Sequence, residues 1–425
     1  LVNLLIDGVI VHTQTLSLVS GTFYVAVASE TGSATKNIHV NFGQKPFRFA
    51  PPAGGYQPLC LTRPTEAVVR PDKHFNTVLY TGNGSSQSIT GVGFQPDFVW
   101  IKQRNAAENH FLTDSIRGAG VHLRTDAQLS ENDDSATFTA FTADGFNLTG
   151  TGAAAPQVND NTDTYVAWCW KAGGAAVSNT DGTITSQVSS NQDAGFSIVS
   201  YTGNSTGGAT VGHGLGKTPS FIVVKNRDVN NTEWLTLHTS IGKNGDTTYG
   251  NEEYYMLRLN SGELRQNYGV DLLFPGNSST FVVGGSGSRW VNHSGDKYIA
   301  YCWSEIPGFS KFGVYNGNGS TYGPFVECGF KPAWVMVKVV NGSTGNSWTV
   351  WDNKRDTSNQ MDLYLHPNES QEDGTYSLIK MDFYSNGFRP IGDIVHQNSS
   401  GIEYVFVAFA EAPTINLYGG QSNAR

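Results

Sequence analysis

The sequence predicts an all-β protein made of antiparallel β-sandwiches in tandem. Glycine accounts for 49 of the 425 residues, and charged residues make up only 15 %. That balance is typical of short strands joined by tight turns, because helix surfaces need more Lys, Glu and Arg. The apolar runs FVWIK (98–102) and FIVVK (221–225) are rich in β-branched and aromatic residues and have the length of strands. No window longer than about twelve residues combines a helical pattern with caps.

A short motif occurs three times and indicates internal repeats. Tyr80 begins YTGNG, Tyr201 begins YTGN and Tyr315 begins YNGNG. Each tyrosine ends an apolar strand, and each Gly/Asn turn leads to a proline that introduces a second strand ending in lysine. The tyrosines are too far apart for a solenoid or propeller, whose repeats span about 20 to 50 residues. The spacing instead predicts tandem domains in which the three tyrosines occupy equivalent positions.

The ends of the three copies also align. The segments are TYVAWCWKAGG (164–174), KYIAYCWSEIPG (297–308) and EYVFVAFAEAP (403–413). Cys169 and Cys302 align with Ala408, which predicts a small buried position. The chain has no CxxC pair and only two further cysteines, Cys60 and Cys328, so we expect free thiols and no disulfide or zinc site.

The first 70 residues have a different pattern. NFGQKPF (41–47) follows two expected strands in 21–59 and resembles the closing segment of SPRY-type domains. The resemblance implies that residues 1–62 are the C-terminal strands of such a sandwich, with its earlier strands before Leu1. The start LVNLLIDG lacks Met and the features of a signal peptide, so we expect the interior of a longer polypeptide.

The sequence as a whole resembles tail-fibre and related virion structural proteins of bacteriophages. In the first copy the resemblance rests on Pro96, Asp97, Trp100, Lys102, Asp114, Ser115, Arg117 and Gly118. The second copy departs from the pattern with Ser220 in place of Asp97, and the third copy loses the Cys-Trp pair. The resemblance implies concanavalin-like or jelly-roll sandwiches. The predicted domains are 1–62 (SPRY-like), 63–174, 175–308 and 309–425 (three sandwich repeats).

No pattern predicts a catalytic, cofactor or metal site. HExxH, GxSxG and P-loop motifs are absent, and the acidic stretches 130–135, 250–254 and 369–374 lie among turn residues, where solvated loops are expected. Asn159, Asn161 and Asp163 have the spacing of calcium ligands but lack the Gly and distal Glu of that loop. Five histidines share no spacing and are expected at the surface: His110, His122, His213, His238 and His293.

Carbohydrate binding stays open at this stage. Aromatic residues near turns could form a sugar platform; the candidates are Trp234, Trp290, Trp348, Trp351 and Tyr322. Trp234 and Trp348 fall on equivalent strands, which favours core packing over a ligand platform. The ligand-binding residues are therefore not assigned.

These observations favour a non-enzymatic phage virion protein, a tail or head fibre that serves assembly and host-surface attachment. The alternatives are a secreted polysaccharide-degrading enzyme, in which Glu131 or Glu253 would be tested first, and a cellular glycan-binding adhesin. The expected partners are other virion proteins, host-surface glycans and further copies of the chain. A net charge of −9 without a basic block argues against nucleic acid as a partner. The sequence has no run of 18 apolar residues, so we expect no membrane insertion.

Overall fold

The computed structural model describes residues 2–6, 9–14, 70–241, 243–244, 253–267, 272–285, 289–342, 345–412, 414–415 and 421–422. Their contacts divide the chain into two units, Leu1–Pro64 with Thr414–Ser422, and Thr65–Pro413 with Asn423–Arg425. In the first unit, strand β1 (Val2–Ile6) pairs with β2 (Val9–Gln14), and β33 (Thr414–Ile415) pairs with β34 (Gln421–Ser422). Of the SPRY-like domain predicted for residues 1–62, the structure describes only β1 and β2; the two strands and the NFGQKPF segment expected in 21–59 lie outside the described residues, and the domain stays a prediction.

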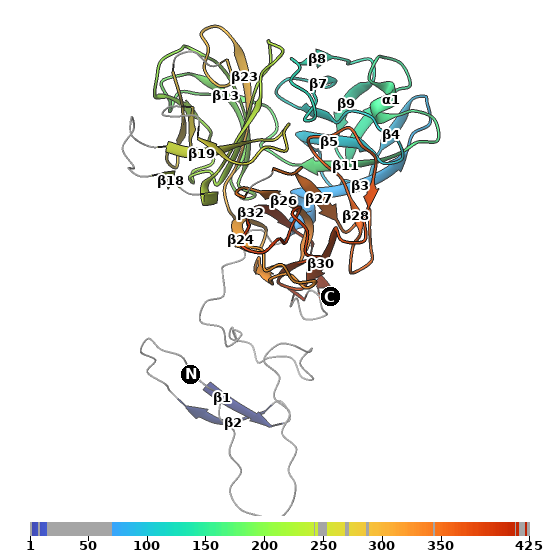
Figure 1. Cartoon of the computed structure of the whole chain (residues 1–425), viewed down its shortest axis with the longest axis vertical. Coiled ribbons are helices and arrows are strands. Elements are labelled where there is room, and N and C mark those ends of the chain that lie inside the picture. The colour runs from blue at the N-terminus through green and yellow to red at the C-terminus, as the bar shows by residue number, and fades with distance from the viewer. Residues whose placement is uncertain are drawn as a thin grey trace, which may run out of the picture. The chain divides into compact units, whose positions relative to one another are not determined.

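The second unit confirms the predicted all-β fold class. Every pair of neighbouring strands in the described residues is antiparallel. Helical structure in the described part of the chain is limited to α1 (Ala155–Val158) and two single 3-10 turns, Pro71–Lys73 and Thr239–Ile241. The strands fall into three groups that surround a common centre, and we call these groups modules 1, 2 and 3 (Figure 1).

Module 1 is a sandwich of a main sheet and a small sheet. The main sheet has the order β3 (Phe75–Thr81), β11 (Thr164–Trp170), β5 (Phe98–Gln103), β6 (Phe111–Asp114), β7 (Val121–Leu123) and β8 (Asn132–Asp133). The small sheet has the order β4 (Gln87–Ile89), β10 (Gly145–Leu148) and β9 (Phe138–Thr142).

Module 2 has the same plan with extra strands at both edges. Its main sheet has the order β12 (Val177–Asn179), β13 (Ser186–Asn191), β14 (Phe196–Thr202), β23 (Lys297–Trp303), β16 (Phe221–Asn226), β17 (Trp234–His238), β19 (Glu253–Arg258) and β18 (Lys243–Asn244), with β20 (Gln266–Asn267) beside β19. The small sheet has the order β15 (Ala209–Gly212), β22 (Thr280–Val283) and β21 (Leu273–Phe274).

Module 3 repeats the plan with the fewest strands. Its main sheet has the order β24 (Ser310–Asn316), β32 (Glu403–Ala410), β26 (Pro332–Val339) and β27 (Thr349–Asp352). The small sheet has the order β25 (Val326–Glu327), β31 (Gly387–Ile391) and β30 (Lys380–Tyr384), and β28 (Leu363–Tyr364) pairs separately with β29 (Gly374–Thr375).

The three main sheets share one strand order: the opening strand, the closing strand, then the second and third strands after the turn motif, since the first strand after the turn enters the small sheet. We propose that the modules are three copies of one domain. The boundaries 63–174, 175–308 and 309–425 stay predictions, because contacts join Thr65–Pro413 into a single compact unit.

The recurring tyrosines occupy equivalent positions, as predicted. Tyr80, Tyr201 and Tyr315 pair in register with Tyr165, Tyr298 and Tyr404 on the closing strands, and each pair of rings stacks at 5.1 Å. Each of the first three donates its hydroxyl to a backbone carbonyl of the segment before the closing strand; the acceptors are Val158, Val291 and Gln397, at 2.7–2.8 Å. The tyrosine therefore anchors that segment to the main sheet.

The turn after each tyrosine does not make a hairpin, because its two flanking strands enter different sheets. A buried asparagine side chain holds the turn instead, accepting the backbone N–H of Asn83, Asn204 or Asn318; the asparagines are Asn159, Asn292 and Asn398. Gly82 is required by a close approach, since a Cβ there would lie 2.0 Å from the carbonyl oxygen of Asp160.

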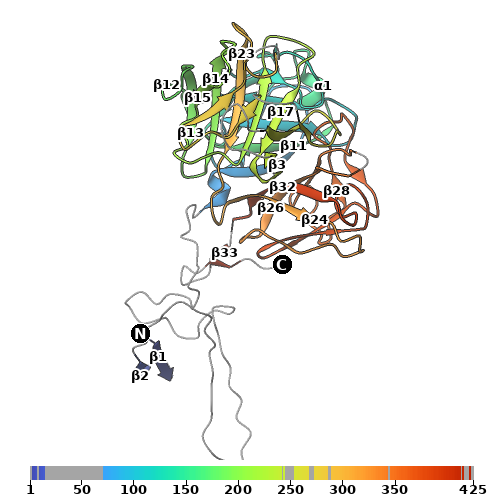
Figure 2. The same cartoon turned by 60° about the vertical axis from the view of Figure 1, so that its left-hand side comes forward.

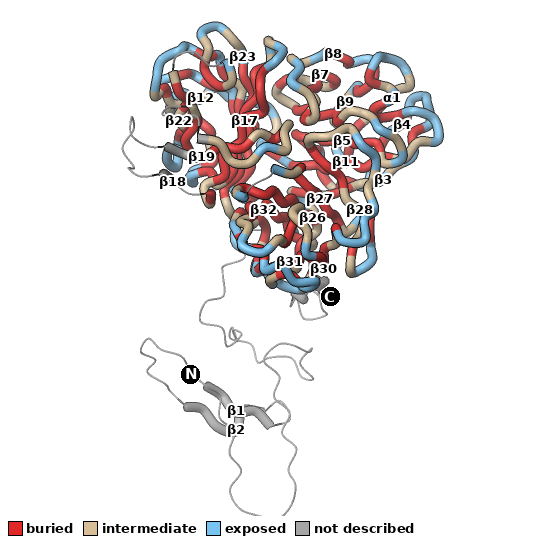
Figure 3. The backbone as a smooth tube through the Cα atoms, in the orientation of Figure 1, coloured by how far each residue is buried: buried red, intermediate tan, exposed pale blue. Residues whose placement is uncertain are grey.

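Both faces of the central strands of the main sheets are buried, which explains the continuous apolar runs in the sequence. In β5, Val99 and Ile101 pack toward the small sheet of module 1, whereas Phe98 and Trp100 face the centre, where they join a core shared with modules 2 and 3. Figure 3 shows buried backbone concentrated where the three modules meet. Seen after a 60° turn, modules 1 and 2 again lie against module 3 (Figure 2).

Three of the four cysteines follow the prediction. Cys169, Cys302 and Cys328 are free and buried, and burial raises the pKa of each thiol well above its usual value. Cys60 lies outside the described residues. Cys169 and Cys302 sit in the register of Ala408, opposite Val99, Ile222 and Val335, so they fill a small position in the core.

The tyrosine anchor can be tested in module 2. Tyr201→Phe leaves the buried carbonyl of Val291 without its donor, and we expect the free energy of unfolding to fall by about 1–2 kcal/mol. Urea denaturation measures the change. Tyr322→Phe is the matched control, because Tyr322 is 59 % exposed, and equal effects of the two substitutions would contradict the anchoring role.

Candidate functional site

The polar residues that could take part in catalysis or ligand binding gather where the modules meet. At or just before the start of β6, β17 and β27, one side chain contacts a backbone carbonyl of a neighbouring module. Trp234 Nε1 donates to Arg124 at 2.9 Å, Trp348 Nε1 donates to Arg258 at 2.9 Å, and His110 Nε2 contacts the carbonyl of His366 at 3.1 Å. Module 2 thus contacts module 1, module 3 contacts module 2, and module 1 contacts module 3.

The other end of the same strand makes a second cyclic contact. Tyr301 donates its hydroxyl to Asp114 at 2.8 Å, and Trp168 donates its indole N–H to Asp352 at 3.1 Å. Tyr301 and Trp168 occupy the same register of their closing strands, opposite Val223 and Trp100. In module 2 the register of these aspartates holds His238, whose Nε2 lies 3.1 Å from the carbonyl oxygen of Phe406 in module 3.

Each of these aspartates binds a buried arginine three residues later. Arg117 Nε lies 2.5 Å from Asp114, and Arg355 Nε lies 2.5 Å from Asp352, with all four side chains inaccessible to solvent. Burial opposes the charge on Arg117, but Asp114 and Tyr301 outweigh it and raise the pKa of the guanidinium. Arg355 also covers the ring of Trp168 at 5.6 Å, which ties module 3 to module 1.

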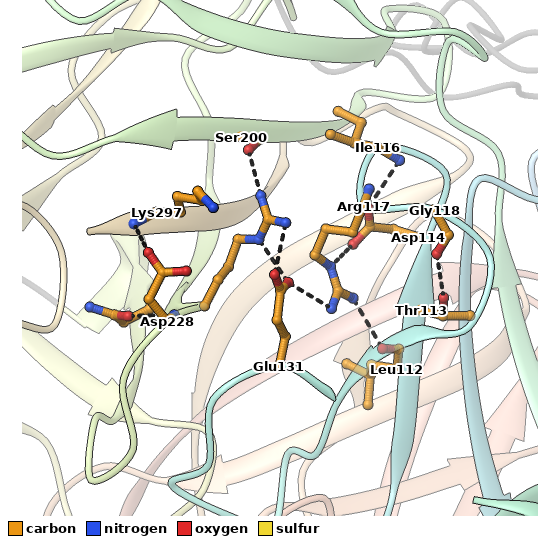
Figure 4. Close-up of polar contacts among 12 residues, drawn as sticks. Leu112, Thr113, Asp114, Ile116, Arg117, Gly118, Glu131, Ser200, Asp228 and Lys297 are labelled. Atoms are coloured by element: carbon orange, nitrogen blue, oxygen red, sulfur yellow. Dashed lines mark hydrogen bonds and ion pairs between the residues drawn. The ribbon is translucent and has the colours of Figure 1, made fainter. Parts of the chain in front are cut away.

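Ion pairs extend this network across each interface. Glu131 of module 1 accepts two hydrogen bonds from Arg227 of module 2, at 2.8 and 3.0 Å, and lies 3.8 Å from Arg117. Figure 4 shows Glu131 at the centre of this network, with Arg117 and Asp114 on one side and Ser200, Asp228 and Lys297 on the other. Modules 1 and 3 are joined by Arg104 and Asp373 at 2.8 Å, and modules 2 and 3 by Arg265 and Glu403 at 3.1 Å.

The lysine next to the end of β5, β16 and β26 is fully buried. Lys225 donates to the carbonyl of Thr232 at 2.9 Å, and Lys338 donates to the carbonyl of Gly262 in module 2 at 2.8 Å. Burial lowers the pKa of Lys225 and Lys338 to about 7 and that of Lys102 to about 8, and nearby carboxylates only partly offset it. Each ammonium is held by carbonyl oxygens, so we assign these lysines to holding loops in place.

The prediction that the scattered histidines lie at the surface is wrong for four of the five. His110, His122, His213 and His238 are at most 1 % exposed, and His293 is half-buried. His110, His213 and His238 contact backbone carbonyls of segments that only folding brings together, whereas His122 contacts the carbonyl of Gly120, two residues earlier. His110 accepts from Trp100 Nε1 on its Nδ1, so its Nε2 carries the proton that faces module 3.

Two acidic stretches expected to be solvated loops also hold interface residues. Glu131 and Asp373 are mostly buried in ion pairs, whereas Asn132, Asp133 and Glu372 are exposed as expected. Glu253 begins β19, and its side chain is not among those the structure describes. Glu131 and Asp373 have equivalent placements: the backbone N–H of Glu131 donates to the carbonyl of Arg227, and that of Asp373 donates to the carbonyl of Arg104. This equivalence is the signal of an interface role that the sequence analysis missed.

The aromatic candidates divide as the repeat alignment suggested. Trp234 and Trp348 are fully buried, which confirms the predicted core packing, and Trp351 is fully buried as well. Trp290 is partly buried, and Tyr322 is exposed. The structure does not gather the five into one platform: Trp234 and Trp348 lie in the shared core, whereas Trp290 packs on the core of module 2.

The segment that resembles a calcium loop is used by the protein itself. Asn159 binds Asn83 and Ser85 of the turn, and Asp163 accepts from Gln103 at 2.8 Å and Asn105 at 3.0 Å. Within the described residues, no group of three or more His, Cys, Asp or Glu side chains has an arrangement that could hold a metal ion.

A comparison with protein families identifies the family to which the compact unit belongs. The profile of a domain of unknown function, DUF7483, matches residues 70–413. The chain belongs to the DUF7483 family. The match covers all three modules and leaves out the region in which the SPRY-like segment was expected.

Two further comparisons add little. No curated protein matches the chain. A solved structure titled "Crystal Structure of the STIV MCP" is similar at 8 % identity, over 56 % of this chain and 92 % of that chain, with a TM-score of 0.18. A TM-score that low does not support an argument about fold or function. No helix among the described residues is long and apolar enough to cross a membrane.

The buried ion pair predicts a large effect of a single substitution. Arg117→Gln leaves the Asp114 carboxylate buried without its counter-ion, and we expect the free energy of unfolding to fall by about 3–5 kcal/mol in urea denaturation. Arg70→Gln, which removes an exposed pair with Asp72, is the control and should leave the value unchanged. An effect of Arg117→Gln no larger than that of the control would contradict the assigned role.

The buried histidines predict acid sensitivity. Ser240 N–H donates to His238 Nδ1, so the ring is neutral with its proton on Nε2 toward Phe406, and burial lowers the pKa of His238 to about 4. Between pH 6.5 and 4 the unfolded chain therefore binds more protons than the folded one. Stability from His238 is complete above pH 6.5 and is lost as the pH falls.

His238→Gln measures this contribution, because glutamine keeps a donor for Phe406 but does not titrate. We expect the pH dependence of the unfolding free energy between pH 6.5 and 4 to flatten by up to about 1.4 kcal/mol per pH unit. His293→Gln, at a half-buried site in module 2, serves as the control. An unchanged slope in His238→Gln would show that His238 is not the sensitive group.

Proposed function

We propose that this protein is a non-enzymatic structural component of a bacteriophage virion, a tail or head fibre that presents a rigid block of β-sandwiches to other virion proteins and to the host surface. One observation carries the proposal: the residues with catalytic potential hold the modules together. Asp114, Arg117, Glu131 and Arg227 form one inter-module network, and Asp352, Arg355, Asp373 and Arg104 form its counterpart.

The virion assignment is supported by the resemblance of residues 75–174 to repeated units of phage fibre proteins. Within that stretch, Asp114 and Arg117 belong to the matching motif, and the structure gives them a mechanical role at the interface with module 2. A motif whose residues join modules fits a building block better than a catalyst. In such a protein, several weak contacts on one particle multiply affinity without a strong single site.

The alternative of a polysaccharide-degrading enzyme requires two carboxylates that face one cleft, about 5 Å apart in a retaining enzyme. Of the two glutamates considered as catalytic candidates, Glu131 is the one whose side chain the structure describes, and its carboxylate is paired with Arg227 and Arg117. No observation in the described residues favours this alternative over a structural role.

Two measurements test the proposal together. Antibodies raised against residues 70–412 should label intact particles at a fixed position in electron microscopy, and particles that lack the protein should lose the label. The purified chain should release no reducing ends from host polysaccharide above background, and chelators should leave its Tm unchanged. Hydrolysis that is lost in Glu131→Gln, with unaltered Tm, would establish an enzyme and overturn the proposal.

A further inference from the structure

The small sheet of module 3 carries exposed aromatic side chains. Three aromatic side chains among the described residues are exposed, and all three belong to module 3: Tyr322 (59 %), Tyr376 (50 %) and Phe325 (41 %). Tyr322 pairs with Ile391 of β31, and Phe325 directly precedes β25, so these two lie on the small sheet. Strands β30 and β31 lie on the side of module 3 that is remote from modules 1 and 2 (Figure 3). A cluster of exposed apolar side chains on a folded surface is typical of a binding site.

The strand register separates the two faces of this sheet. Phe388 of β31 packs on Phe406 of the main sheet, with ring centroids 5.1 Å apart, so its side of β31 faces inward. Successive side chains of a strand alternate between the faces, so the neighbours of Phe388 point outward. The outward row that contains Gly387 is completed by its register partners, Glu327 and Tyr384. We call this side of the sheet the outer face.

The rings on the outer face hold one another in place. The rings of Phe325 and Tyr384 meet edge to face, with centroids 5.7 Å apart. Gly387 leaves room for this contact, because a Cβ there would lie 3.0 Å from Phe325 Cζ. The guanidinium of Arg389 lies over the ring of Tyr384, 5.6 Å from its centre. The surface is therefore formed before a ligand binds, which lowers the entropy lost on binding.

Comparison with module 1 shows that the fold does not require these rings. Phe146 and Phe388 occupy the same register of their small sheets. The positions of Phe325, Tyr384 and Arg389 are accordingly held in module 1 by smaller polar residues: Ser88, Thr142 and Asn147. Tyr322 lies in a segment between the turn and the small sheet that is longer in module 3 than in module 1. The aromatic outer face is thus an addition peculiar to module 3.

The charges on the outer face indicate an uncharged partner. Lys380, in register with Ile391, lies 3.8 Å from Asp362, and Arg389 and the exposed Glu327 add one charge of each sign. A surface with balanced charge favours neither an anionic nor a cationic partner.

The placement of these charges favours a sugar over a protein. A protein interface typically gathers apolar residues at its centre and charged residues at its rim. Here Glu327 lies in the row of Tyr384, and Lys380 lies in the row of Tyr322, so charged groups alternate with rings. A pyranose matches this pattern, because its C–H face packs on an aromatic ring while its hydroxyl groups exchange hydrogen bonds beside it.

We propose that the outer face binds a neutral polysaccharide, with sugar rings stacked on Tyr322 and Phe325. Glu327 accepts hydrogen bonds from the sugar hydroxyl groups, and Lys380 donates to them. The inference rests on the proposed function only for the source of the polysaccharide, the host surface. A single open face gives weak binding, and many copies on one particle strengthen it.

Affinity electrophoresis of the full chain in native gels tests the proposal. The gels contain dextran, galactomannan or xyloglucan as neutral polymers, or polygalacturonate as an acidic one. We expect at least one neutral polymer to retard the chain, with a Kd in about the millimolar range, and polygalacturonate to have no effect. Tyr322→Ala and Phe325→Ser, which installs the residue of module 1, should each weaken binding about fivefold or more. Leu129→Ala, at a side chain of module 1 that is 43 % exposed, should leave binding unchanged.

Each contrary result has a defined meaning. Retardation by none of the neutral polymers, or equal retardation of both face variants and the unaltered chain, overturns the site. Stronger retardation by polygalacturonate overturns the neutral assignment. Self-association in sedimentation velocity that Phe325→Ser abolishes, without polysaccharide binding, assigns the face to a second copy of the chain instead.

Two controls keep these outcomes apart from other causes. Tyr322 and Phe325 are exposed, so a normal Tm is expected in both variants and separates lost binding from lost folding. Particle labelling tests the proposed function independently, since labelled particles without polysaccharide binding would keep the virion role and remove only this site.

Discussion

Burial of both faces of each main sheet is the constraint on which the rest of the structure depends. A sandwich normally leaves the outer face of each sheet to solvent, but here the central strands of the main sheets are buried on both faces, and exposure is left to their edge strands and to the small sheets. The second face of every main sheet carries large aromatic side chains, among them Trp170 in module 1, Trp303 in module 2 and Phe409 in module 3. Trp170 lies 6.3 Å from Trp303 and 5.6 Å from Phe409, so no module can cover this face alone. The space between them is nearly filled, with a cavity of about 20 Å³ left at the centre.

This apolar centre decides where the charges lie. Polar groups at its border are removed from water, and a buried charge is tolerated only when it is paired and hydrogen-bonded. The positions are shared between modules, but the residues are not: Asp114 and Asp352 occupy a register that holds His238 in module 2. The module that supplies the arginine also differs around the cycle. Between modules 1 and 2, Arg227 of module 2 pairs with Glu131 of module 1, the preceding module. Between modules 2 and 3, Arg265 of module 2 pairs with Glu403 of module 3, the following module. The geometry of the contact is thus more constant than its chemistry, and each interface has been free to acquire features of its own.

Features that repeat locally could be predicted from the sequence, and features that depend on distant segments could not. The tyrosine turns and the small position of Cys169 were predictable because each appears three times in the same local context. The role of the turn was only partly predicted, because the asparagine that holds it, Asn159, lies far along the chain from Asn83. The burial of His238 and the pairing of Glu131 arise from neighbours in other modules, so neither spacing nor composition points to them. The lysines near the ends of β5, β16 and β26 were visible in the sequence, but their burial follows only from the approach of loops such as that of Gly262.

The cyclic order of the contacts has a consequence for assembly. Module 1 meets module 2, module 2 meets module 3, and module 3 meets module 1, so the head-to-tail interface returns to its start within one polypeptide. Such an interface forms rings when it closes and filaments when it does not. With all three partners on one chain, closure is an intramolecular event whose yield does not depend on protein concentration. Each folded polypeptide therefore holds a complete three-module block of fixed stoichiometry, and a scarcity of copies lowers the number of blocks without producing incomplete ones.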